Sequence, residues 1–180
     1  MRTATLVLVA YGLCVIIAAA WRLLPFAMVR DGVPDIGALT AAYLGLTARR
    51  DVAPAVGGSV VLGYLVDVIG GAPAGLAALT LGLTSLVTRS VQQRLLVRGL
   101  ALTVAFSGFV AVVSRVFSLV VRTLYGVSHA SMLVELRHLA LVAVATALVG
   151  PLVWRMFRRV DAMFARTQRE RDAALEGLAP

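Results

Sequence analysis

Two ionisable side chains inside apolar stretches are the residues of this chain most suited to chemistry. Asp67 lies in Gly63-Tyr-Leu-Val-Asp67-Val-Ile-Gly70, and Arg115 lies inside the apolar run Gly99–Val121. An ionisable group at the centre of a bilayer costs about 2.5–3.5 kcal/mol on insertion scales. Such a residue therefore marks a ligand, proton or partner contact unless the protein satisfies it internally. A carboxylate and a guanidinium in the same half of a helical bundle could also neutralise each other.

Each of the two charges also has a structural interpretation, and the sequence favours it. Asp67 precedes the turn Gly70–Gly75, where its carboxylate would accept backbone N–H groups or cap the following helix. Arg115 lies about six residues from the end of its run, so its side chain could reach the membrane interface. Whether the two residues pair is left open by the sequence.

No constellation for catalysis or metal binding accompanies these charges. Glu135 and His138 have the E-x-x-H spacing that places two ligands on one helix face, but a di-metal site needs such ligands on other helices too. His129 is the only other histidine, and no histidine or lysine base stands beside the scattered serines and threonines. The single cysteine, Cys14, lies in an apolar run and indicates packing. We expect no enzymatic activity, no metal and no cofactor.

The elements that must position these residues are membrane-spanning helices. Sixty per cent of the residues are apolar and only 14% are charged, against about 25% charged in a soluble domain. A single soluble core of 180 residues cannot bury so much apolar surface. The formal charge of +8 comes from arginines at helix ends, which fits lipid head groups and topology rather than nucleic acid. The sequence therefore predicts an all-α integral membrane protein.

Six apolar runs approach the about 17–25 residues that cross a hydrocarbon layer. They are Thr3–Trp21, Ile36–Ala48 extended by Val33 and Pro34, Val52–Ile69, Ala74–Thr88, Gly99–Val121 and Leu139–Phe157. Twelve of the seventeen arginines then fall on one side and four on the other, with Arg115 in the membrane. This asymmetry predicts six transmembrane helices with both termini cytoplasmic, although the short second or fourth run could instead be re-entrant.

The end of the chain is expected to leave the membrane. Residues 1–157 would form the six-helix transmembrane domain and residues 158–180 a basic, amphipathic cytoplasmic tail. Gly150-Pro151 should kink the sixth helix or end its regular part. The longest loops are expected at Arg22–Val33 and Arg122–His138.

An ordered set of marks runs through the second, third and fourth spans. Pro34-Asp35 suits a helix start, where a carboxylate near the positive end of the helix dipole is stabilised by about 0.3–1 kcal/mol. An aromatic residue follows inside the second span, and basic residues that control topology end that span. In the third span an aspartate is followed by a Gly/Pro turn. The marks are Pro34, Asp35, Tyr43, Arg49, Arg50, Gly63, Asp67, Gly70, Pro73 and Gly75. In this order they resemble the MreD family of rod shape-determining membrane proteins.

The resemblance implies a scaffold of the bacterial cell-elongation machinery in the inner membrane. It implies binding to the single-span protein MreC and, through that assembly, contact with a transglycosylase, a transpeptidase and MreB, which supports peptidoglycan synthesis. It also implies an architecture similar to the substrate-binding subunits of energy-coupling-factor vitamin transporters. Membership of that transporter class is the alternative hypothesis, in which Asp67, Arg115 and the outer loops would line a vitamin pocket.

Overall fold

The structure, a computed structural model, describes residues 2–22, 32–47, 52–92, 99–126 and 131–176. These ranges contain six α-helices and no strand, so the prediction of an all-α fold is confirmed for them. The helices are α1 Arg2–Arg22, α3 Ile36–Thr47, α4 Val52–Gly70, α5 Leu76–Gln92, α6 Leu100–Leu124 and α7 Met132–Glu176.

The length and apolar character of the helices identify a membrane-embedded protein. Four of the described helices, α1, α4, α6 and α7, are long and apolar enough to cross a membrane. The other two, α3 and α5, are apolar but shorter. With 12 residues and about 1.5 Å rise per residue, α3 extends over much less than the about 30 Å of the hydrocarbon layer.

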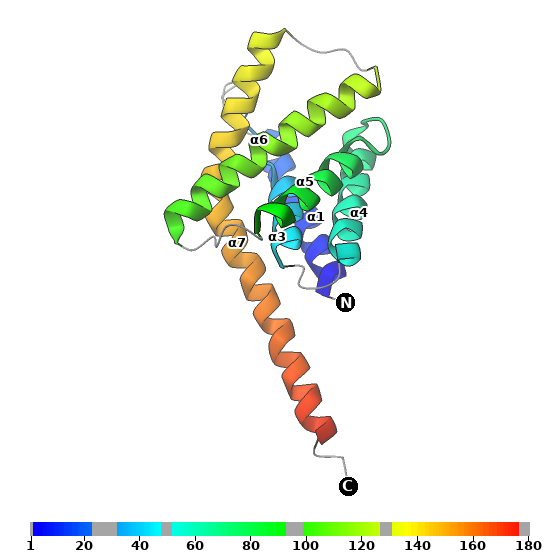
Figure 1. The fold of residues 1–180 in the computed structure, drawn as a ribbon, viewed down its shortest axis with the longest axis vertical. Helices are drawn as coiled ribbons and strands as arrows, with labels where there is room; N and C mark the ends of the chain where they lie inside the picture. The colour runs from blue at the N-terminus through cyan, green and yellow to red at the C-terminus, as the bar shows by residue number, and fades with distance from the viewer. Residues whose placement is uncertain (1, 23–31, 48–51, 93–98, 127–130, 177–180) are drawn as a thin grey trace.

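The short helix α3 is the centre of the bundle. All its residues from Ile36 to Gly45 are buried, and α1, α4, α5, α6 and α7 all contact it. Figure 1 shows α3 enclosed among α1, α4 and α5, with α6 and α7 crossing beside them. Because protein rather than lipid surrounds α3, its length need not match the bilayer. Polar groups of its buried part therefore need partners within the protein.

Glycine lets the backbones around α3 approach closely. A Cβ atom added at Gly63 of α4 would lie 2.5 Å from backbone atoms of Ala77 and Ala78 on α5. A Cβ added at Gly45 of α3 would lie 2.5 Å from the carbonyl oxygen of Ser85 on α5. Helices in lipid have no hydrophobic driving force for association. Small residues at these contacts let the helices come close enough for van der Waals packing to hold them together. The glycine at position 63 thus permits the close contact of α4 with α5.

Most buried hydroxyl groups bond to their own helix. Each donates to the carbonyl oxygen of the residue four positions earlier, as in Thr40 to Ile36, Ser59 to Ala55, Thr80 to Leu76, Thr84 to Thr80 and Ser107 to Thr103. This back-bonding satisfies a hydroxyl where no water is present. These hydroxyl groups therefore serve the fold.

Two helices begin three or more residues away from the start of their predicted spans. The second span was expected to extend over Val33 and Pro34, whereas α3 begins at Ile36. The side chain of Asp35 accepts the backbone N–H of Ala38 at 2.8 Å, so Asp35 is the cap and the two preceding residues lie outside the helix. The sixth helix was expected from Leu139, whereas α7 begins at Met132.

The early start of α7 shortens the loop predicted at Arg122–His138. Helix α6 continues to Leu124 and α7 includes Glu135, Arg137 and His138. These charged residues suggested a loop, but they lie in the first turns of α7, whose Met132 and Leu133 are largely exposed. Pro151 does not end the helix, which is continuous to Glu176. Figure 1 shows α7 changing direction where its colour passes from yellow to orange, the region that includes Pro151.

We predict that Gly63→Ala destabilises the bundle, whereas Gly57→Ala in the same helix does not. The new methyl group at position 63 meets the backbone of α5, and such overpacking costs about 1–3 kcal/mol. Nothing lies within 4 Å of a Cβ at Gly57, so that variant controls for helix propensity. Thermal melting in detergent measures both, and equal melting temperatures would contradict the close α4–α5 contact.

Candidate functional site

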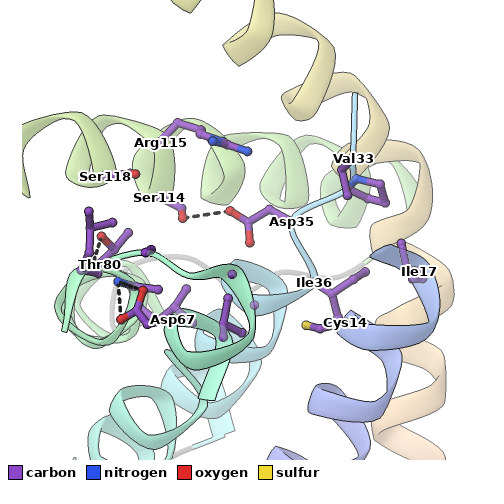
Figure 2. A pocket seen from close by; sticks show the side chains of 18 of the residues that line it. Cys14, Ile17, Val33, Asp35, Ile36, Asp67, Thr80, Ser114, Arg115 and Ser118 are labelled. Carbon is purple, nitrogen blue, oxygen red and sulfur yellow. Dashed lines mark hydrogen bonds between the residues drawn. The ribbon is translucent and has the colours of Figure 1, made fainter. Parts of the chain in front are cut away.

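A cavity lies at the N-terminal end of α3, between α1, the α4–α5 turn and α6. Its volume is about 330 Å³. Figure 2 shows Arg115, Ser114 and Ser118 on the α6 side, Asp67 on the opposite side, and Cys14 and Ile17 on α1. The cavity exists at this end because the longer helices around α3 continue past its first turn. It brings together Pro34, Asp35, Asp67, Gly70 and Arg115, which the sequence had singled out separately.

Asp35 joins three helices at the edge of this cavity. One carboxylate oxygen accepts the N–H of Ala38 at 2.8 Å, and the other accepts the hydroxyl of Ser114 on α6 at 3.0 Å. The backbone N–H of Asp35 donates to Thr146 Oγ1 on α7 at 2.9 Å. The role expected from Pro34-Asp35 was a helix start, and Asp35 has that role. Its links to Ser114 and Thr146 were not foreseen.

Asp67 holds the turn between α4 and α5. Its carboxylate accepts the backbone N–H groups of Gly75 at 3.0 Å, Ala77 at 3.0 Å and Ala78 at 3.4 Å. The side chain is buried, with 3% exposure, and its charge is offset by the first N–H groups of α5. This is the structural role that the sequence favoured for Asp67.

The turn itself depends on the Gly/Pro segment. Gly75 has φ +96°, a conformation that L side chains rarely adopt, and it carries one of the N–H groups that Asp67 accepts. The carbonyl of Pro73 accepts the N–H of Leu76 at 3.2 Å, which starts α5. Gly70 is the last residue of α4 and lines the cavity.

Arg115 is a charge that the described part of the protein leaves without a partner. Its Nε atom is buried and has no hydrogen-bond partner among the described residues. No ion pair joins it to Asp67 or Asp35, both of which are described and line the same cavity. Figure 2 shows its guanidinium directed toward the side of the cavity where Asp35 and Val33 lie. The pairing with Asp67 that the sequence left open is thus absent.

Tyr43 lies elsewhere, toward the C-terminal end of α3. Its hydroxyl donates to Asp161 Oδ2 on α7 at 2.6 Å. Its ring packs against Trp154 and Phe157, with centroid distances of 6.1 and 5.2 Å. Tyr43 therefore fastens α3 to α7. Sequence reasoning missed Asp161 because it stands among arginines in an amphipathic segment and resembled a solvated residue.

The other polar residues that the sequence singled out lie away from the Asp35 and Asp67 contacts. Arg49 and Arg50 lie outside the described residues. Glu135 and His138 line a smaller hollow that Arg115, Ser118 and Arg122 also border. Within the described ranges, no three or more His, Cys, Asp or Glu side chains are grouped to hold a metal ion.

Sequence reasoning also missed Ser114 and Ser118, which line the cavity beside Arg115. Their i, i+4 spacing places the two hydroxyl groups on one face of α6. This spacing around an intramembrane arginine was the available signal for a polar helix face.

Comparison with known proteins gives no relative for this chain: no protein-family model, no curated protein and no solved structure matches it. The site is therefore interpreted from its own geometry.

We predict that Asp67→Ala and Arg115→Ala affect stability additively. Asp67→Ala leaves three N–H groups without their acceptor, of which the N–H of Ala78 is buried, and one buried unsatisfied group typically costs about 1–3 kcal/mol. Independent sites add to within about 0.5 kcal/mol, so the double variant should equal the sum. Unfolding by titration with dodecyl sulfate in mixed micelles measures this. Asp35→Ala and Ser114→Ala, which remove two residues that share a hydrogen bond, are the coupled control. If the double variant of Asp67 and Arg115 loses less stability than the sum of the single variants, the two residues interact.

Proposed function

We propose that this chain is a non-enzymatic membrane scaffold of the bacterial cell-elongation machinery, similar to MreD. The observation that carries the proposal is the ordered set of marks between Pro34 and Leu76. Their positions suit a scaffold, because Asp35 and Asp67 hold helix ends, Gly63 lets two helices pack and Tyr43 fastens α7. None of these contacts requires a substrate. A rigid bundle of this kind is a suitable platform for other membrane proteins.

In this role the chain binds MreC in the inner membrane. Through MreC it connects to the transglycosylase and transpeptidase that extend peptidoglycan, and to MreB. A single-span partner needs an apolar helix face on which to pack. Helix α4 has several exposed apolar side chains that lipid or a partner helix would cover: Val60, Val61, Tyr64, Val68 and Ile69.

The same proposal gives the topology: six spans, with α3 crossing inside the bundle, α5 crossing at its surface, and both termini in the cytoplasm. Figure 1 supports it, because the start of α1 and the end of α7 lie on the same side of the molecule. Arginine asymmetry supports the cytoplasmic assignment of that side. The part of α7 that projects from the bundle is then a cytoplasmic stem.

The topology prediction is tested by labelling single cysteines in a variant with Cys14 replaced. Cysteines after Arg50, Gly71, Arg94 and Arg171 should be cytoplasmic, periplasmic, cytoplasmic and cytoplasmic, because the arginine-rich segments stay inside. A periplasmic signal after Arg94 would mean that α5 does not cross, and the six-span proposal would fail.

One observation favours a second candidate, a substrate-binding subunit of an energy-coupling-factor vitamin transporter. The cavity of about 330 Å³ is lined by Asp35, Asp67 and Arg115, charged side chains that would orient a small polar substrate. Its volume is at the lower end of the about 300–1,000 Å³ typical of ligand pockets. Neighbouring genes separate the two candidates: a gene for MreC favours the scaffold, and genes for coupling ATPases favour the transporter.

The role prediction is that depletion makes rod-shaped cells round or lytic and that the purified chain retains MreC. A plasmid copy with Gly57→Ala should restore the rod shape. Gly63→Ala should restore it poorly, because it disturbs the α4–α5 contact. Cell microscopy and co-purification measure the two effects. Normal shape after clean deletion, with a vitamin retained on purification, would replace the scaffold by the transporter subunit.

A further inference from the structure

The charged side chains that line the cavity differ in how many hydrogen-bond partners the protein gives them. Asp67 accepts three backbone N–H groups, and Asp35 accepts one backbone N–H and one hydroxyl. The carboxylates are therefore already used by the protein itself. Arg115 has a buried Nε without a hydrogen-bond partner and no ion pair among the described residues. The cavity consequently retains donor capacity on its α6 side.

Two further hydrogen-bond donors line the α6 side of the cavity. Ser118 and Arg122 follow Arg115 at three and seven residues along α6, which places the three side chains on one helix face. Unlike the back-bonded hydroxyls of Ser59 and Ser107, the Ser118 hydroxyl makes no hydrogen bond within the described part of the chain. The carboxylate of Glu135 borders the smaller hollow, and within the same part of the chain no ion pair joins it to Arg115 or Arg122.

We propose that the cavity binds a phosphate ester, held by Arg115 and Arg122 with Ser118. Guanidinium groups bind phosphate oxygens through paired N–H donors, and such charge-assisted hydrogen bonds are among the strongest in proteins. A phosphate monoester carries close to two negative charges, which two arginines neutralise, whereas one carboxylate would leave one arginine unbalanced. Binding also removes the penalty of an unpartnered cation within a membrane-spanning helix.

The size of the cavity limits the ligand to a small one. A volume of about 330 Å³ accommodates a phosphate with a short polar substituent and excludes acyl chains. The phosphate monoester can belong to the head group of phosphatidate, with its acyl chains outside the cavity, or to a soluble molecule such as glycerol 3-phosphate. The binding chemistry is the same in both cases, and it operates whether the chain is a scaffold or not.

The test measures thermal melting of the purified full chain in a neutral maltoside detergent free of phospholipid. Glycerol 3-phosphate is the soluble probe, phosphatidate is the lipid probe because its phosphate is also a monoester, and sodium chloride at matched ionic strength is the control. We expect a higher melting temperature with at least one phosphate probe and none with chloride. A shift with both probes assigns the site to the phosphate group itself, and a shift with the lipid alone assigns it to a head group.

Arg115→Gln distinguishes a ligand-binding arginine from a structural one. Without probe, the variant should melt at the same temperature as the parent or higher, because the lost guanidinium has no described internal partner at Nε. With probe it should bind about tenfold more weakly or worse, the loss expected for one charge-assisted hydrogen bond. Arg158→Gln, an exposed arginine on α7 away from the cavity, should behave like the parent.

Two results would overturn the phosphate site: no phosphate-dependent shift in the parent chain, or an equal shift in Arg115→Gln. Loss of stability in Arg115→Gln without probe would likewise assign the residue to the fold. The scaffold proposal has a separate readout, MreC co-purification. A chain that retains MreC but shows no phosphate-dependent shift loses only the phosphate site, and the reverse outcome loses only the scaffold role.

Discussion

The burial of a short helix at the centre of a membrane bundle is the constraint on which the rest of this structure depends. Helix α3 contacts five other helices and is buried from Ile36 to Gly45. In such surroundings an unpaired polar group costs several kcal/mol, so the polar groups of its buried part need partners from the protein. The partners come from α6 and α7, the helices most distant from α3 in the sequence. Satisfying α3 therefore fixes how the two halves of the chain meet.

The two halves of α3 are joined to the rest of the bundle in different ways. At the N-terminal end, Asp35 caps its own helix and bonds to Ser114 and Thr146. Toward the C-terminal end, the hydroxyl of Tyr43 reaches Asp161 beside Trp154 and Phe157. The second contact is an aromatic cluster, whereas the first uses small polar groups. Space consequently remains at the Asp35 end, and the turn held by Asp67 closes one side of it.

Local chemistry could be predicted from the sequence, and distant contacts could not. The role of Asp67 follows from an aspartate placed shortly before a Gly/Pro turn, because its bonds reach only eight to eleven residues along the chain. The partnership of Tyr43 with Asp161 spans 118 residues and leaves no local pattern. At Pro34-Asp35 two local preferences competed, proline in a first helical turn and aspartate at the cap, and the cap prevailed. The start of α7 was missed because the charged residues in its first turns are also typical of a loop between two spans.

The contrast between Asp67 and Arg115 separates the part of this protein that maintains the fold from the part that is available for function. Both are charges in apolar helices, and sequence alone treats them alike. The structure surrounds Asp67 with three N–H donors, so its charge belongs to the fold. It leaves the Nε of Arg115 buried and unpartnered among the described residues, where nearly every other buried polar group is satisfied. Proteins usually depart from internal consistency at functional sites, and for that reason we propose the α6 side of the cavity, rather than the ordered Gly/Pro turn, as the part of the bundle that binds a small ligand.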